Sequence, residues 1–228
     1  MNARAAVAEF VGTAFLLLAV VGSGIMAQRL CGGNVGLALL ANAVATGGAL
    51  IALILAFGSV SGAHFNPVVT LASALREKTW SGVLPYVIAQ VLGALAGTAL
   101  ANLMFGLPAF TASHHERSGS AMIVSEFIAT FGLLAVIWGC ARSRPAAAPY
   151  AVAAYIVGAY WFTPSTSFAN PAVTIARSLT DTFSGIRPVD VPALVAVQIL
   201  GALAATFLFV WFGMRADESV VVPQSEAA

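Results

Sequence analysis

The sequence contains two similar halves, and this internal repeat limits the folds that the chain can adopt. Early in each half a glutamate leads an apolar segment, later an Asn-Pro pair opens a mixed segment, and a glutamine leads a last apolar block. Three blocks in the same order within each half indicate a duplicated structural unit. The matched pairs are AEFVGT at 8–13 with SEFIAT at 125–130, SGAHFNPVVTLASAL at 61–75 with STSFANPAVTIARSL at 165–179, and QVLGALAGT at 90–98 with QILGALAAT at 198–206.

Composition places both halves in a membrane. Hydrophobic residues make up 60% of the 228 residues, charged residues only 8%, and the mean hydropathy is +0.92, which is typical of membrane proteins. The apolar stretches run continuously, so the expected fold class is an all-α membrane protein rather than a β-barrel. Crossing a bilayer needs about 20 apolar residues, and the fifth of the predicted spans is the weakest because Pro164 cuts it short. The six spans are 7–27, 36–58, 83–105, 121–140, 148–163 and 191–213.

Each half carries three spans, so the second half enters the membrane from the opposite side and the repeat is inverted. A slight bias of Arg and Lys favours an N- and C-terminus in the cytoplasm, in a multi-pass protein of the inner (plasma) membrane. The first segment lacks a clear cleavage site and is read as a retained helix. We expect a single transmembrane domain over 1–228, with repeat one at about 1–106, a linker loop at about 107–120, repeat two at about 121–214 and a C-terminal tail at 215–228.

The two Asn-Pro segments are predicted to form short helices that enter the membrane without crossing it. Asn is a favoured N-cap and Pro fits the first helical turn, so Asn66 and Asn170 begin these helices. Each is about ten residues, or about 15 Å long, so two of them from opposite faces would meet near the midplane. The carbonyls before each Asn are tolerated only along a protein-lined cavity. The candidate pore-lining residues are Gly62, Ala63, His64, Phe65, Phe168 and Ala169.

Two Asn-Pro pairs in register within an inverted repeat resemble the aquaporin (major intrinsic protein) family, whose signature is a duplicated Asn-Pro-Ala in two re-entrant half-helices. The resemblance covers nearly the whole chain. It implies six transmembrane helices plus two half-helices, a homotetramer with one pore per protomer, and passive flux of water or small neutral solutes. By the same resemblance, Asn66 and Asn170 form the midplane pair, and Glu9 and Glu126 support the re-entrant loops.

The chain departs from this family at the predicted selectivity filter. The first motif is Asn-Pro-Val, and Val173 stands where the family has an arginine. The other filter positions, counted from the asparagines, fall on Thr46, Gly158 and Ser167. All four residues are small and lack a charged donor fork, so the ring resembles the wider rings of members that pass glycerol, urea or neutral metalloid hydroxides such as arsenous acid.

Two other interpretations of this region remain open. A bulky neighbour, either Phe57, Tyr160 or Trp161, can refill the space left by the small residues. Arg177, one helical turn beyond Val173, can partly replace the missing arginine by reaching back toward the pore mouth. We interpret Gln90, Gln198 and the matched small residues near them as packing contacts between helices: the small residues are Gly93, Gly97, Gly201 and Ala205.

The predicted function is a passive channel for small uncharged solutes that excludes ions, although the missing arginine weakens its proton barrier. A water-selective aquaporin is the first alternative. A coupled secondary transporter is the second, but the only acids predicted at depth, Glu9 and Glu126, are assigned to loop support. We expect no enzyme, because no catalytic cluster appears in the apolar segments, and no cofactor or metal site. A net charge of +1 gives no surface for nucleic acid.

Overall fold

The computed structural model describes residues 3–213, which form helices joined by loops, as the predicted fold class requires. The predicted C-terminal tail at 215–228 lies outside the described residues. The elements are α1 Ala3–Leu30, α2 Val35–Ser61, α3 Pro67–Glu77, α4 Val83–Met104, α5 Ser120–Ser143, η1 Pro145–Ala147, α6 Ala148–Phe162, α7 Pro171–Arg177, η2 Pro188–Asp190 and α8 Val191–Trp211.

In the described part of the chain, five helical segments are long and apolar enough to cross a membrane: α1, α2, α4, α5 and α8 together with η2. The remaining predicted span, α6, has only 15 residues, or about 22 Å of helix. It ends early because the residue before a proline is disfavoured in the helical conformation. Thr163, which precedes Pro164, has an extended backbone with φ of −119°. The weakest predicted span is therefore also the shortest.

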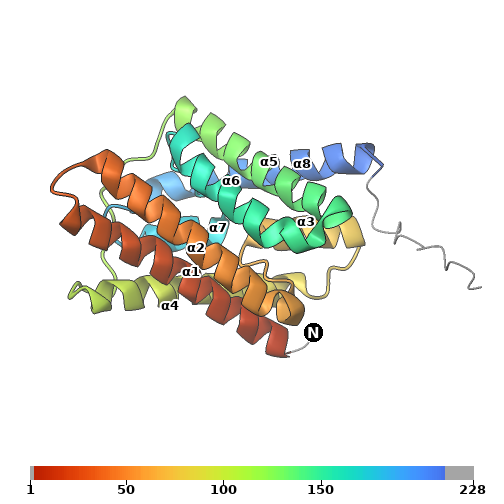
Figure 1. Ribbon diagram of the computed structural model, residues 1–228, viewed down its shortest axis with the longest axis horizontal. Helices are drawn as coiled ribbons and strands as arrows, with labels where there is room; N and C mark the ends of the chain where they lie inside the picture. The colour runs from red at the N-terminus through yellow and green to blue at the C-terminus, as the bar shows by residue number, and fades with distance from the viewer. Residues whose placement is uncertain (1–2, 214–228) are drawn as a thin grey trace, which may run out of the picture.

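The five long helices and α6 form two groups that follow the sequence repeat. Helix α1 packs against α2 and α4, α5 packs against α6 and α8, and the two groups meet where α2 contacts α6. The short helices α3 and α7 contact each other and lie between α4 and α8. In Figure 1, α3 lies toward the right-hand end of the molecule, where α1 begins and α8 ends, and α7 lies further left. The helical architecture confirms the predicted fold class.

Small residues let the long helices of each group approach closely. In α4, Gly93 lies against the carbonyl of Phe10, and Gly97 lies against the carbonyl of Ala14, both in α1. In the other group, Gly201 of α8 lies against the carbonyl of Phe127 in α5. A Cβ atom at any of these glycines would collide with backbone. The close contacts predicted at these three glycines are therefore confirmed, and they are of the kind that membrane helices use in place of hydrophobic burial.

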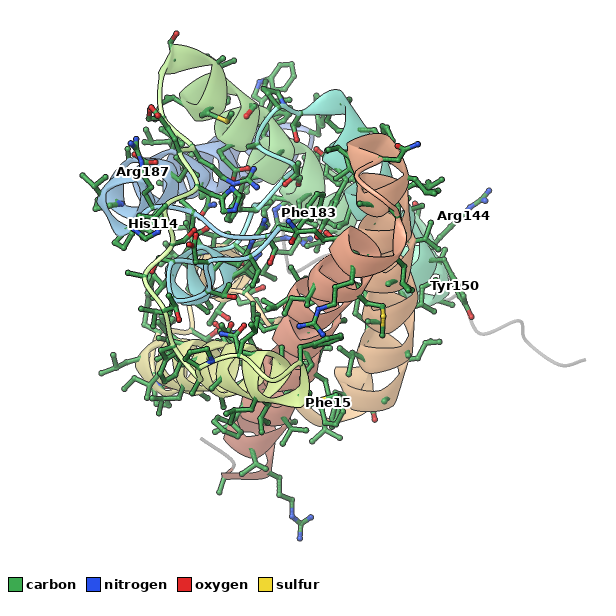
Figure 2. All side chains as sticks on the ribbon, turned by 90° about the vertical axis from the view of Figure 1, so that its left-hand side faces the viewer. Phe15, His114, Arg144, Tyr150, Phe183 and Arg187 are labelled. Atoms are coloured by element: carbon green, nitrogen blue, oxygen red, sulfur yellow. The ribbon has the colours of Figure 1, made fainter. Side chains whose placement is uncertain are left out.

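Two connecting segments lie across the end of the bundle beyond α7. Segment 107–119 bonds to segment 178–187, for example through Ser113 N–H to the Ser178 carbonyl at 3.0 Å. The Asp181 carboxylate accepts bonds from the backbone N–H and ring nitrogen of His114 at 2.9 and 3.0 Å, and these bonds lower the pKa of Asp181. Figure 2 looks onto this end of the molecule, with His114 labelled on the first segment. The loop that joins the halves is thus bonded to the loop that follows α7.

Candidate functional site

Asn66 and Asn170 begin the two short helices and lie against each other's loop. The Oδ1 atom of each accepts the backbone N–H two residues further on, at 3.1 and 3.0 Å, as an N-cap does. Asn66 Nδ2 donates to the Ala169 carbonyl, and Asn170 Nδ2 donates to the Phe65 carbonyl, both at 2.8 Å. The starts of α3 and α7 therefore meet, and each half completes the hydrogen bonding of the other.

The backbone before each Asn alternates through the left-handed region. Ala63 and Phe65 have φ of 50° and 49°, and Ser167 and Ala169 have φ of 50° and 47°. Non-glycine residues in this region cost about 1–3 kcal/mol each and persist only where the surroundings hold them. The matching values in the two repeats show that the strain belongs to the duplicated unit.

The Glu9 carboxylate in α1 holds the loop before Asn66. It accepts the Ser61 hydroxyl at 2.6 Å, the backbone N–H groups of His64 and Phe65 at 3.0 and 2.7 Å, and Gln90 Nε2 at 2.7 Å. Glu9 is fully buried. A buried carboxylate needs such a set of donors, and here two of the four are backbone groups of the re-entrant loop.

Glu126 in α5 has the same role in the second half. Its oxygens accept the backbone N–H groups of Phe168 and Ala169, both at 2.9 Å, and Gln198 Nε2 at 2.7 Å. Glu126 is also fully buried. Both acids therefore fix loop backbone in a strained conformation, which leaves neither of them lining the cavity between the loops.

The two matched glutamines do more than pack, which corrects our interpretation of the sequence. Gln90 Nε2 also donates to the Thr70 hydroxyl at 2.8 Å, and Gln198 Nε2 donates to the Thr174 hydroxyl at 2.9 Å. Each glutamine thus ties a glutamate to a half-helix. The repeat itself carried the signal, because a glutamine held at the same place in both apolar blocks has no packing advantage over leucine.

A cavity of about 250 Å³ is lined by both asparagines. The re-entrant loops form its polar wall, through residues 62–66 and 167–170. Within residues 3–213 no Asp or Glu lines it. Its other walls come from α1, α2, α5 and α6, and on α2 and α6 the lining residues form single stripes spaced by four residues. These are Thr46, Leu50 and Ile54 of α2, and Val152, Ile156 and Tyr160 of α6.

The stripe on α6 corrects one predicted filter position. Thr46, Ser167 and Val173 line the cavity, but Gly158 does not. Tyr160 lines it instead, and its hydroxyl lies 3.3 Å from the Thr46 hydroxyl. Counting back from Asn170 gave the wrong position because it assumed the length of the intervening loop. The ring is therefore narrower than four small residues would make it.

Of the three bulky neighbours considered above, only Tyr160 refills the ring. Phe57 packs edge-on against Phe65, with ring centroids 6.1 Å apart. Trp161 is 51% exposed on the outside of the bundle. Neither of these two lines the cavity.

A second hollow of about 420 Å³ continues the cavity at the α3 end, and His64 and Ser73 line both. His64 Nδ1 lies 3.1 Å from the Thr70 hydroxyl, and its ring lies 5.6 Å from that of Tyr86. His64 is therefore held at the junction of the two spaces. The polar wall of the path extends from this junction to the α7 end.

These features define a helical membrane protein with a polar path where two opposed half-helices meet. Residues 1–167 match the family described as Major intrinsic protein, and the chain belongs to this family. It is 53% identical to Aquaglyceroporin AqpS of Rhizobium meliloti (strain 1021), over 91% of this chain and 89% of that protein. It is 33% identical to Aquaporin Z of Rhodopseudomonas palustris, over 78% of this chain and 79% of that protein.

A solved structure shows the same fold. The aquaglyceroporin from Plasmodium falciparum superposes with a TM-score of 0.62 at 22% identity, over 93% of this chain and 96% of that one. The predicted resemblance to the family is thereby confirmed at the level of sequence and of fold.

Proposed function

We propose that the protein is a passive transmembrane channel for small uncharged solutes, and that it excludes ions. The observation that carries this proposal is the pairing of Asn66 and Asn170 in one cavity that no carboxylate of residues 3–213 lines. The asparagine amides and loop carbonyls offer hydrogen bonds to a neutral permeant. A coupled transporter needs an ionisable group for its driving ion, and Glu9 and Glu126 are occupied by loop backbone.

Ion exclusion follows from the lining. An ion must replace its hydration shell to enter, and the walls from α2 and α6 are mostly apolar. The N-termini of α3 and α7, which carry partial positive charge, meet at the asparagines. Cations are therefore repelled at the centre of the path.

Glycerol-like solutes, urea and neutral metalloid hydroxides such as arsenous acid are the proposed permeants, together with water. The relative with 53% identity is named an aquaglyceroporin. Val173 also supports permeation by these solutes. In the ring of Thr46, Tyr160, Ser167 and Val173, this valine stands at the position where water-selective relatives have an arginine. Tyr160 limits how wide the ring becomes, so we expect the smaller solutes of this class.

The proposed assembly is a homotetramer with one pore in each protomer, and each protomer is one domain. The proposed location is the inner (plasma) membrane with both termini in the cytoplasm. The start of α1 and the end of α8 lie at the same end of the molecule (Figure 1), as this arrangement requires. Cross-linking of the purified protein and site-directed labelling of its ends in whole cells test these two points.

Stopped-flow light scattering of proteoliposomes tests the proposed function. We expect rapid entry of glycerol and urea as well as water, driven only by their gradients. Arsenous acid is assayed by its accumulation in the same vesicles. Water flux with exclusion of all three solutes would show a water-selective aquaporin. Uptake against a gradient would show a coupled transporter.

A further inference from the structure

Among the matched lining positions of the two repeats, one pair differs by a full charge. Arg177, seven residues after Asn170, corresponds to Ser73, seven residues after Asn66. Both side chains line the cavity, one at each end. Arg177 follows Val173 by four residues on α7, so it extends the same stripe toward the α7 end of the path. The sequence repeat thus places a cation at one end only.

The Arg177 guanidinium is fixed in place but keeps most of its donors. Its Nε donates to the Ser184 carbonyl, and its Cζ lies 3.6 Å from the centroid of the Phe168 ring. The side chain is only 2% exposed. Within residues 3–213, neither Nη atom has a hydrogen-bond acceptor. A buried guanidinium with two free Nη groups beside a cavity is directed at something that enters that cavity.

No acid neutralises this charge from the cavity. Within the described residues no carboxylate lines the space that Arg177 faces. A second guanidinium, that of Arg117, lies 5.1 Å from the same Phe168 ring. Arg117 donates from Nη1 to the carbonyl of Ser165 and from Nε to that of Gly185, both at 2.9 Å, so one of its Nη groups is used by the protein. The α7 end of the path therefore carries excess positive charge.

Ser167 supplies a second free polar group at the same end. Its Oγ atom is buried and has no partner among residues 3–213. The residue lines the cavity next to Phe168. Leaving a buried hydroxyl and a buried guanidinium without partners is costly. A permeant that bonds to both removes this cost.

We propose that Arg177 and Ser167 form the solute-contacting site of this end, that they bind solutes with neighbouring oxygen atoms, and that Arg177 is the barrier to cations that Val173 cannot supply. This inference rests on the proposed function. A guanidinium only donates, and its planar fork matches two adjacent acceptor oxygens. Glycerol and other polyols present such oxygens. Urea presents one oxygen and its own N–H donors, so it fits less well.

Three variants in proteoliposomes test this assignment. Arg177→Ser copies the residue of the other repeat and removes charge and fork together. Arg177→Lys keeps the charge but loses the fork. Arg29→Ser is the matched control, because Arg29 also stacks on a phenylalanine and donates to a carbonyl, yet it lies outside the cavity. Sodium and proton leak are followed with entrapped dyes, and glycerol and urea entry are followed by light scattering.

We expect Arg177→Ser to raise cation leak about tenfold, since a unit charge acts strongly in a poorly solvated space, and to lower the ratio of glycerol to urea flux. Arg177→Lys should keep the low leak but show the lower ratio. Arg29→Ser should match the wild type. If both Arg177 variants match the wild type in cation leak and in the ratio of glycerol to urea flux, the inference is wrong, but the proposed channel function is unaffected. A wild-type protein that passes no solute would instead remove the proposed function.

Variant folding is checked separately by gel filtration in detergent. If Arg177→Ser does not fold, the inference is tested by the ratio of glycerol to urea flux in Arg177→Lys and Ser167→Ala. Ser167→Ala removes the second contact without changing charge, so it should lower the ratio and leave the cation leak low. An unchanged ratio in both variants would overturn the solute contact.

Discussion

The hydroxyl of Tyr160 lies 3.3 Å from the hydroxyl of Thr46, and this pair joins α6 to α2 at the edge of the path. Both side chains are buried and line the cavity. We therefore expect the size limit of the pore to be set by an aromatic residue from α6, the shortest of the predicted spans.

Tyr160→Ala is expected to widen this ring and to raise the flux of glycerol and larger polyols several-fold, with a smaller change for water. Stopped-flow assays on a series of polyols of increasing length measure the change. Trp161→Ala is the control, because Trp161 is adjacent in sequence but faces outward. An unchanged size limit in Tyr160→Ala would mean that another group sets it.

Val173→Arg is expected to reduce glycerol flux strongly while most water flux persists. The new guanidinium would occupy the path one helical turn from Arg177, and like charges at this spacing also oppose each other. If the free energy of the solute in the filter rises by about 1.4 kcal/mol, the flux falls about tenfold. Equal loss of water and glycerol would show that Val173 does not contribute to the filter.

Glu126→Gln is expected to destabilise the second re-entrant loop by about 3 kcal/mol, because charged hydrogen bonds contribute about 1.5–3 kcal/mol each and one amide oxygen cannot replace both acceptors. The thermal unfolding midpoint in detergent measures this effect. Glu116→Gln is the control, because its side chain is 63% exposed in the linker. A midpoint equal to that of wild type would contradict the role of Glu126.

Gly97→Val is expected to separate α1 from α4, because its Cβ would meet the Ala14 carbonyl. Overpacking of this kind costs about 1–3 kcal/mol. The yield of protein that elutes as a single species in gel filtration should fall. Gly48→Val tests the same change where no atom lies within 4 Å of the new Cβ, and there the yield should stay near wild type.

Acid is expected to release segment 107–119. Hydrogen bonds from His114 lower the pKa of Asp181, so the contact stabilises the fold above the ordinary Asp value and is lost as the pH falls below about 4. Limited proteolysis between pH 3 and pH 6, with an acid-active protease, follows the release. Asp181→Asn should show faster cleavage already at pH 6, and protection equal to wild type there would disprove the contact.

Much of the fold could be predicted because the informative residues act locally or occur twice. Asn-Pro starts a helix by capping, wherever it lies. Glu9 and Glu126 were recognisable by their matched positions. The inverted halves follow from an odd number of spans in each. These arguments need no knowledge of which helices touch.

The filter could not be predicted in the same way. The Gly158 position was wrong because the sequence does not show how the backbone turns between Pro164 and Asn170. The contact of Gln90 with Thr70 and that of Tyr160 with Thr46 join segments that only tertiary packing brings together. Residues that meet across the two halves leave no local signal in the sequence.

The exchange of amide bonds between Asn66 and Ala169, and between Asn170 and Phe65, has a consequence for biosynthesis. Chains emerge from the ribosome N-terminus first, so the first three spans can insert while their asparagine still lacks its acceptor. The narrow centre can close only after more than a hundred residues beyond Asn66 have been translated, because Asn66 and Ala169 are 103 residues apart. A truncated chain that ends between the halves would leave a bilayer-embedded loop with an unsatisfied amide, and quality-control proteases would meet it in that state.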